Sequence, residues 1–231
     1  AKAALGGIVN DRPVDLTAPV ADGDAVAIVT AKSPEALELL RHSTAHVMAA
    51  ALTDLFGDVE FGVGPAIENG FYYDVKLPDG KALSPDDFAA IEARMAEIIA
   101  TDEPFVRTEV TRDEALALFA GQPLKRELIE ELPEGETITT YAIGSFTDLC
   151  RGPHLPSTGK IPAFKLTKLA GAYWKGDSNR EMLTRLYGTA FFSKKELEEH
   201  LHNLEEAEKR DHRKLGRELG IYMMDPMAGV G

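Results

Sequence analysis

The spacing of apolar and polar positions changes along the chain, and the first part, residues 1–31, holds only short apolar runs. Two of these runs, at 7–10 and 25–29, are separated by turn-forming residues at 11–13 and 21–24. Short apolar runs bounded by Gly, Pro and Asp predict β-strands. Two strands bury too little surface to form a core alone, so we interpret this part as a fragment of a small β-rich domain.

Apolar residues recur at helical spacing in the next part of the chain. Ser33-Pro34-Glu35 predicts the start of a helix, with Ser33 as its N-cap, and Gly57 predicts its end. Residues 61–75 are typical of two strands joined by the turn Glu68-Asn69-Gly70. Three further helices are predicted at 84–98, 111–119 and 124–132.

From residue 137 to residue 192, β-branched and aromatic runs broken by Gly and Pro predict strands. Helices followed by strands predict an α+β fold. The sequence Ser193-Lys194-Lys195-Glu196 is a capping box that opens a long charged helix, with apolar positions as far as Leu219. So few apolar positions on a long helix indicate a connector between domains. The predicted strands are 141–150, 163–168, 172–175 and 182–187.

Composition narrows the class of protein. Hydrophobic residues make up 44% of the 231, which is enough for a core, and no apolar run approaches the roughly 18 residues of a membrane span. The first residues lack the pattern of a secretory signal. The single cysteine, Cys150, excludes an internal disulfide and fits a reducing compartment. We therefore expect a cytoplasmic protein with no membrane partner.

Charge is unevenly distributed along the chain, whose formal net charge is −13. Residues 81–140 carry 14 acidic and 6 basic side chains, whereas residues 150–190 carry seven basic and two acidic ones. An acidic protein with one basic face can still bind RNA locally. A solvated mixed surface is the alternative, and charge alone does not separate the two.

Two short motifs bring together residues that carry chemistry. His42 and His46, in His42-Ser43-Thr44-Ala45-His46, lie one above the other on a helix, and Cys150 and His154 flank a Gly-Pro turn. Two His, a Cys and a further His can bind zinc tetrahedrally, or without metal can orient and deprotonate a water. Taken singly, neither pair indicates a site. Two histidines at this spacing occur more often by chance on a surface or in a core, and a lone cysteine is usually a small buried apolar residue. Residue types alone leave open whether the pairs converge.

The two motifs resemble those of the editing domain of threonyl-tRNA synthetases, the second of them as Asp148-Leu149-Cys150-Arg151-Gly152-Pro153-His154. Further matches follow in the family's order: a strand–turn–strand at 64–74, a signature loop at 169–179 and a linker helix at 209–216. Alanyl-tRNA synthetases usually have Gly-Gly-Thr between Cys and His, so Arg151-Gly152-Pro153 favours the threonyl family.

The resemblance implies three parts. Residues 1–31 correspond to part of a ubiquitin-like β-grasp (TGS) module, residues 32–192 to the editing domain, and residues 193–231 to the linker helix and the start of the class II catalytic region. The editing domain is expected to be an antiparallel sheet packed with helices, of the type called the second additional domain of threonyl- and alanyl-tRNA synthetases. The family's core, which uses ATP, Mg and zinc and forms the homodimer, lies beyond this chain. The chain is then either a fragment or a protein that acts on tRNA charged elsewhere. Because the family's dimer forms through the core, we expect that this part alone can be a monomer.

The implied reaction is hydrolysis of the serine ester on mischarged tRNA(Thr), at the acceptor end. A missing methyl discriminates serine from threonine by only about 1–3 kcal/mol, so a second, hydrolytic sieve is required. The resemblance implies no cofactor and no metal in this part of the chain. His42 is the first candidate for the partner of the water, Lys125 would lie near that water, and Asp148 would hold the substrate amine or ribose. The implied catalytic residues are His42, His46, Lys125, Asp148, Cys150 and His154, and the implied substrate-binding residues are Tyr72, Tyr73 and Arg151.

Tyr72 and Tyr73 alternate across a predicted strand, so only one of them is expected to face the pocket. Two other functions remain open from the sequence: a metallohydrolase that acts on a small molecule, and a non-catalytic module that binds RNA or a protein surface.

Overall fold

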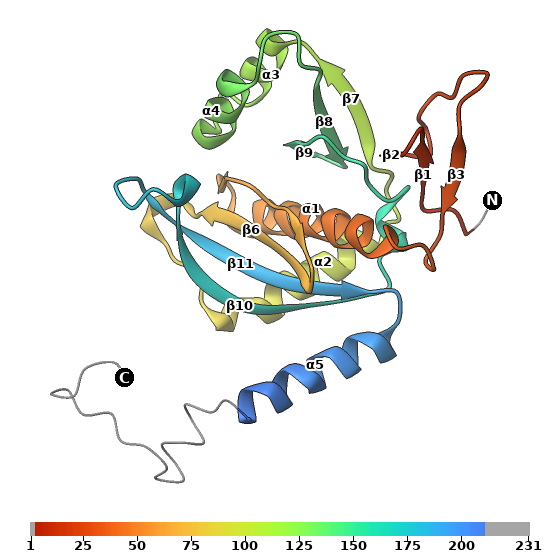
Figure 1. Cartoon of the computed structure of the whole chain (residues 1–231). Helices are drawn as coiled ribbons and strands as arrows, with labels where there is room; N and C mark the ends of the chain where they lie inside the picture. Colours follow the sequence, from red (N-terminus) through yellow and green to blue (C-terminus); the bar gives the residue numbers. More distant parts are fainter. Residues whose placement is uncertain (1–2, 211–231) are drawn as a thin grey trace, which may run out of the picture. The chain divides into compact units, whose positions relative to one another are not determined.

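The computed structural model describes residues 3–210 (Figure 1). The contacts divide the chain into two compact units, Ala1–Phe192 and Ser193–Gly231. The first unit has an α+β fold with antiparallel sheets, which confirms the predicted fold class. The three-part division into 1–31, 32–192 and 193–231 stays a prediction.

A small antiparallel sheet opens the first unit, with strand order β2-β1-β3. Its strands are β1 (Gly6–Val9), β2 (Arg12–Val14) and β3 (Val26–Val29). The predicted turn at 11–13 is wrong, because the turn lies at Asn10 and Asp11, both with positive φ, and Arg12 already pairs with Val9. Pro13 is tolerated because β2 is an edge strand.

Helix α1 (Ala36–Phe56) forms the centre of the first unit. Its N-cap is Glu35, so the predicted cap at Ser33 is wrong: the Ser33 hydroxyl accepts a hydrogen bond from the Thr30 N–H and closes the preceding turn. Most of the helix is buried on all sides, including a run of alanines from Ala49 to Ala51 that lets neighbouring elements approach closely. A helix buried all round must have elements packed on more than one face.

One face of α1 packs on the larger antiparallel sheet, with strand order β10-β11-β6-β4 and β5 paired to β6. The predicted strand 163–168 and the first two residues of the predicted strand 172–175 belong to one strand, β10, with a bulge between Leu166 and Lys168. The prediction is wrong for Trp174 and Lys175, which lie in a 3₁₀ turn. Helix α2 (Phe88–Ala100) packs beside α1. The strands are β4 (Glu60–Phe61), β5 (Ala66–Ile67), β6 (Gly70–Lys76), β10 (Ala163–Tyr173) and β11 (Met182–Phe191).

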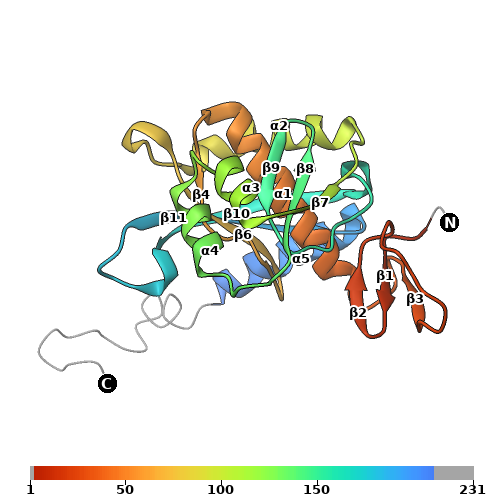
Figure 2. The ribbon, with the colours of Figure 1, turned by 90° about the horizontal axis from the view of Figure 1, so that it is seen from above.

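A three-stranded sheet lies across α1 from the larger sheet (Figures 1 and 2). It consists of β7 (Val106–Val110), β8 (Ile138–Ile143) and β9 (Phe146–Leu149). The strand predicted at 141–150 is a hairpin that turns at Gly144 and Ser145, and β7 has no counterpart in the sequence prediction. Between β7 and β8 the chain forms α3 (Arg112–Leu118) and α4 (Pro123–Glu131), both predicted. Short 3₁₀ turns occupy Pro78–Gly80, Pro85–Asp87, Thr158–Lys160 and Trp174–Gly176.

The second unit is described as far as residue 210 and contains helix α5 (Lys194–Lys209). Half of the predicted capping box is present: the Ser193 hydroxyl accepts from the Glu196 N–H, and it donates to the Glu196 carboxylate. The predicted extension to Leu219 lies outside the described residues. Over residues 3–210, no helix combines the length and apolar character required to cross a membrane.

Candidate active site

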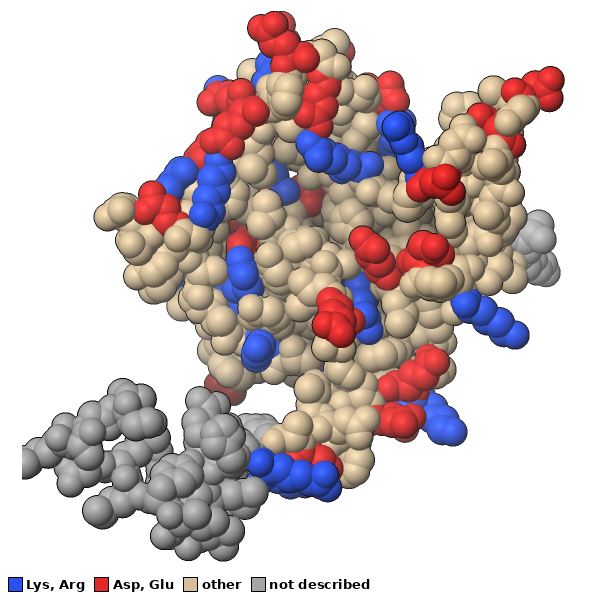
Figure 3. All heavy atoms as spheres, viewed as in Figure 1, with Lys and Arg blue, Asp and Glu red and all other residues tan. Residues whose placement is uncertain are grey.

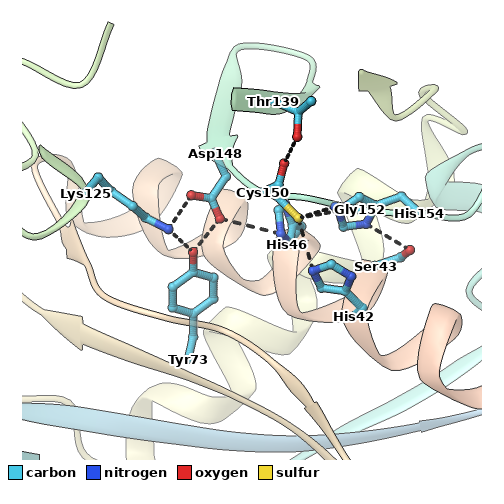
Figure 4. Close-up of polar contacts among 10 residues, drawn as sticks. All are labelled: His42, Ser43, His46, Tyr73, Lys125, Thr139, Asp148, Cys150, Gly152 and His154. Carbon is cyan, nitrogen blue, oxygen red and sulfur yellow. Dashed lines mark hydrogen bonds and ion pairs between the residues drawn. The ribbon is translucent and has the colours of Figure 1, made fainter. Parts of the chain in front are cut away.

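The two motifs identified in the sequence meet between α1 and the chain that follows β9 (Figure 4). Ligand atoms of His42, His46, Cys150 and His154 all lie within 4.8 Å of one another. Helical spacing places His42 and His46 on the same face of α1, with ring centroids 5.1 Å apart. The convergence that residue types alone left open is therefore present in the fold.

The thiol of Cys150 lies between two imidazoles. Its Sγ is 3.2 Å from His42 Nε2 and 3.3 Å from His154 Nε2, and the Gly152 N–H donates to it at 3.2 Å. His154 stacks face to face on Phe105, with centroids 4.9 Å apart. At these distances, Cys150 Sγ is hydrogen-bonded to both imidazoles and to the Gly152 N–H.

Ser43, the residue after His42, ties the loop that follows β9 to the helix. Its hydroxyl accepts a hydrogen bond from the Leu155 N–H at 2.9 Å and lies 3.2 Å from His154 Nδ1. An oxygen that accepts from an N–H still has its own proton to donate, which favours the His154 tautomer with Nε2 protonated toward the thiol. Ser43 lies inside the first motif, but nothing in the sequence alone indicates this role.

A second polar group adjoins the first through His46. Asp148 forms a buried ion pair with Lys125, with Nζ and Oδ1 2.6 Å apart, and its other oxygen accepts a hydrogen bond from the Tyr73 hydroxyl. Lys125 also donates to the Tyr73 hydroxyl at 2.7 Å, and His46 Nε2 lies 3.6 Å from Asp148. The two groups therefore lie side by side: the His46 ring contacts the rings of His42 and His154, and its Nε2 faces Asp148. Together, the residues of the two groups, from Lys125 to His154, are called the network.

Burial sets the protonation states of this network. It lowers the pKa of His46 from 6.5 to about 3, that of His154 well below 6.5, and that of His42 below 6.5 as well. It also raises the pKa of the Cys150 thiol to about 12. At neutral pH the site thus presents uncharged imidazoles, which can accept a proton, and an uncharged thiol.

Asp148 is the anion of the network. Burial acts to raise its pKa, but the adjacent Lys125 ammonium, His46 and the hydrogen bonds from Lys125 and Tyr73 bring the pKa below its ordinary value. Burial and the Asp148 charge raise the pKa of Tyr73 well above 10, so the phenol keeps its proton and donates it to the carboxylate.

Two cavities adjoin the network on different sides. One, of about 300 Å³, is lined by Lys125 and Asp148 together with Phe61, Phe119 and Gln122. The other, of about 80 Å³, reaches His42 and Pro153 beneath the N-terminal sheet. The face shown in Figure 3 is hollowed between the five-stranded sheet and the sheet of β7, β8 and β9. A small molecule or the end of a chain can therefore approach the buried groups.

Two of the implied substrate-binding residues point elsewhere. Arg151 is exposed, with 77% of its side chain accessible, and pairs with Glu136. Tyr72 lies on the opposite face of β6 from Tyr73 and packs under the Arg185 guanidinium, 3.9 Å from the ring centroid. Of the two neighbouring tyrosines, Tyr73 is the one that faces the site.

The basic stretch at 150–190 does not provide a free basic face. Five of its seven cations pair with acidic side chains: Arg151 with Glu136, Lys165 with Glu92, Lys175 with Glu127 and Glu131, Arg180 with Glu127, and Arg185 with Asp74. Figure 3 shows the two signs of charge interspersed over the face it presents. Any RNA contact of this chain must compete with these pairs.

Comparison with known proteins defines the class first. Residues 138–187, which cover β8, β9, the Cys150–His154 loop, β10 and part of β11, match the family model of the threonyl and alanyl tRNA synthetase second additional domain. The chain therefore contains a domain of that type, as the sequence motifs predicted.

Curated relatives make the assignment more specific. The whole chain is 52% identical to a threonine–tRNA ligase of Geobacillus sp. (strain WCH70) and 55% identical to one of Halalkalibacterium halodurans, and in each case it spans 36% of the relative's length. Threonine–tRNA ligase 1 of Bacillus subtilis is 52% identical over 232 residues. This chain is thus a relative of the amino-terminal region of threonine–tRNA ligases.

Proposed function

We propose that this chain hydrolyses the ester between serine and tRNA(Thr), the proofreading reaction that its resemblance to threonyl-tRNA synthetases implies. The observation that carries the proposal is the convergence of neutral imidazoles, a thiol and a buried Lys–Asp pair beside a cavity. The relatives and the matched domain support tRNA as the partner. For the longer protein, we propose the attachment of threonine to tRNA(Thr) with ATP.

His42 is our candidate for the base. It is the least buried of the three clustered imidazoles, and its lowered pKa keeps it neutral at pH 7. In the proposed step, His42 takes a proton from a water as the water oxygen bonds to the ester carbon. The bond from that carbon to the ribose oxygen then breaks, the ribose oxygen takes up the proton, and serine leaves as the free acid.

Lys125 and Asp148 supply the charge for this step. The Lys125 ammonium borders the cavity of about 300 Å³ and can stabilise negative charge that develops on the ester oxygen. Asp148 can accept hydrogen bonds from the substrate amine, and Tyr73 holds the carboxylate in place. Serine is distinguished from threonine by one methyl group, so we expect the selectivity to come from close packing around this cavity.

The donor set also fits a metal, which keeps a second function in view. Catalytic zinc is typically held by three protein ligands with a water in the fourth position, and three of these four side chains could form such a site in a small-molecule metallohydrolase. We propose the metal-free reaction, as the resemblance implies. Elemental analysis of the purified chain, together with hydrolysis before and after chelation, separates the two functions: bound zinc and loss of activity with chelator would favour the metallohydrolase.

The decisive experiment is single-turnover hydrolysis of seryl-tRNA(Thr) and threonyl-tRNA(Thr) by the full chain. We expect the serine ester to be cleaved, the threonine ester to be largely spared, and His42→Ala to remove the difference. His202→Ala, at an exposed position of α5, is the matched control and should behave as the unaltered chain does. Equal rates for His42→Ala and the unaltered chain would rule out the proposed base, and absence of cleavage by the unaltered chain would favour a non-catalytic RNA-binding module.

A further inference from the structure

One carboxylate from the N-terminal part of the chain reaches the candidate active site. Asp15 follows β2 directly, 139 positions before His154 in the sequence. Its Oδ1 accepts a hydrogen bond from the His154 N–H at 2.9 Å, and its Oδ2 accepts one from the Tyr141 hydroxyl at 2.6 Å. Hydrogen bonds to a charged acceptor are stronger than those between neutral groups.

Both partners of Asp15 belong to the packing around the thiol. The Tyr141 ring lies 4.5 Å from the His154 ring, centroid to centroid. Gly152 sits so close to Tyr141 that a Cβ there would be 1.9 Å from the phenol oxygen. The Gly152 N–H in turn donates to the Cys150 sulfur. A change in the position of Tyr141 or of the His154 backbone would therefore move the groups that hold the thiol.

The segment that carries Asp15 is itself fixed to α1. Leu5, which precedes β1, and Val29, the last residue of β3, belong to the same buried cluster as Leu39 and Leu40 of α1. A Cβ at Gly6 would lie 3.1 Å from the Leu39 side chain, so β1 approaches the helix as closely as a residue without a side chain allows. Asp15 is thus carried by a segment whose position is fixed by packing on α1.

The loop from Cys150 to His154 is consequently held from two sides. Ser43, on α1, bonds His154 Nδ1 and the Leu155 N–H, and Asp15 bonds the His154 N–H and Tyr141. Ser43 lies in the motif that the sequence analysis identified, whereas Asp15 lies in a segment predicted to be a separate β-grasp fragment. We propose that Asp15 is a positioning residue of the candidate active site, which makes the N-terminal segment a working part of the hydrolytic centre.

This proposal rests on the proposed function only for its activity measurement, because the chain offers an independent reporter. Cys150 is its single cysteine, so the rate at which a thiol reagent such as 5,5′-dithiobis(2-nitrobenzoate) modifies the native chain reports the opening of the Cys150–His154 loop directly. Loss of two hydrogen bonds to a charged acceptor is expected to raise that rate about tenfold or more in Asp15→Ala. Asp22→Ala, in an exposed turn of the same segment, is the matched control with an unchanged rate.

Asp15→Asn refines the test. Its amide oxygen can still accept from the His154 N–H and its amide nitrogen can donate to the Tyr141 oxygen, so we expect labelling near the unaltered rate. In single-turnover hydrolysis of seryl-tRNA(Thr), Asp15→Ala should lower the maximal rate about tenfold or more while half-saturation by tRNA stays constant, and Asp15→Asn should restore most of the rate. If Asp15 only stabilised the fold, Asp15→Ala would also lower the melting temperature. The maximal rate and the half-saturation by tRNA would then change together.

The outcomes separate this proposal from the proposed function. Faster labelling of Asp15→Ala, in a chain that shows no hydrolysis at all, would support the positioning role and refute the hydrolase. Labelling and hydrolysis that are both unchanged in Asp15→Ala would overturn the positioning role and leave the hydrolase standing. Equal acceleration of labelling by Asp22→Ala would also overturn it, because the effect would then be one of the segment and not of this carboxylate.

Discussion

At the scale of single residues, the candidate site is a set of ionisable groups that the protein has taken out of water. Lys125 and Asp148 are each about 97–98% buried, and they satisfy one another together with the Tyr73 hydroxyl. Such a pair contributes little net stability compared with apolar residues, but it leaves a costly buried charge when one partner is removed. We therefore infer that the Lys125–Asp148 pair serves the proposed hydrolysis and not the stability of the fold.

Removal of one partner of this pair gives the first prediction. Lys125→Met leaves the Asp148 carboxylate buried without its cation, and we expect the free energy of unfolding to fall by about 3–5 kcal/mol. The double variant Lys125→Met, Asp148→Leu should recover most of that loss. Urea denaturation measures both. Arg94→Met, which breaks the exposed pair with Asp54, is the control and should cost far less. Equal losses for the single and double variants would refute the argument.

The buried imidazoles make stability depend on pH. His46 has a pKa of about 3 in the folded chain and about 6.5 when unfolded, so the unfolded chain binds more protons between these values. Stability is therefore greatest above pH 6.5 and falls as the pH decreases, by about 1.5 kcal/mol from His46 alone between pH 6.5 and 5. Urea denaturation across that range should show a shallower dependence in His46→Gln and no change in slope in the exposed control His202→Gln.

The same burial predicts the acid limit of the proposed hydrolysis. Because the pKa of His42 is lowered below 6.5, the imidazole stays neutral below the pH at which a solvent-exposed histidine takes up its proton. The midpoint of the decline of the single-turnover rate at acid pH should therefore lie below pH 6.5. A midpoint at or above pH 6.5 would show that another group limits the reaction.

At the scale of elements, the site depends on close backbone contacts that only glycine permits. β6 carries Tyr73 into the site, and Gly70 begins that strand against Gly188 of β11. A Cβ at Gly70 would lie 2.2 Å from the Gly188 carbonyl oxygen, a contact that no side-chain rotation can relieve. The position of Tyr73 is thus fixed partly by two residues that have no side chain.

A pair of alanine substitutions tests this point. Gly70→Ala should force β6 and β11 apart and lower the free energy of unfolding by about 2 kcal/mol or more. Gly121→Ala introduces the same methyl group where no atom lies within 4 Å, and we expect a change within about 0.5 kcal/mol. Thermal unfolding followed by circular dichroism compares the two. Similar melting temperatures for both variants would show that the sheet absorbs the extra atom.

Most elements were predictable from local signals, and the failures have local causes. Helices α1 to α4 and the capping box of α5 follow from apolar spacing and caps. The hairpin of β8 and β9 was merged into one strand because Gly144-Ser145 is a weak turn signal next to β-branched residues. β7 was missed because its sequence Val-Arg-Thr-Glu-Val is largely exposed and its pairing with β8 bridges some thirty positions of chain.

At the scale of the whole molecule, charge is distributed in pairs. The chain has a net charge of −13, and within the stretch 150–190 only Lys160 and Lys168 have no acidic partner in the salt bridges of the described residues. Paired cations neutralise phosphates poorly because they must first give up their carboxylates. This stretch is therefore expected to contribute little to tRNA binding.

The salt dependence of tRNA binding measures this directly. If phosphates are neutralised only by Lys160 and Lys168, the two cations of this stretch without an acidic partner among the described residues, the slope of the logarithm of the binding constant against the logarithm of salt concentration should be about −2. Filter binding or fluorescence anisotropy between low and physiological salt gives the slope. A slope of about −5 or steeper would show that the ion pairs of this stretch open to take up phosphates.

The candidate site was predictable from the sequence in part, for reasons of distance along the chain. His42, His46, Cys150 and His154 form two compact motifs, and the family resemblance added Lys125, Asp148 and Tyr73, all of which the fold brings together. Arg151 lies inside the second motif and Tyr72 is next to Tyr73, but a side chain beside a site residue need not face the same way. Asp15 carries no local signal, since its contacts form only after the N-terminal sheet has packed on α1.

Helix α1 also limits how such a protein can be altered. The helix that carries His42 and His46 is also the central buried helix of the first unit, with other elements packed around it. An engineer who wishes to change which ester is cleaved would lose soluble protein by varying this helix. The turn between β8 and β9, at the rim of the cavity beside Ser145 and Phe146, should tolerate a mutant library better.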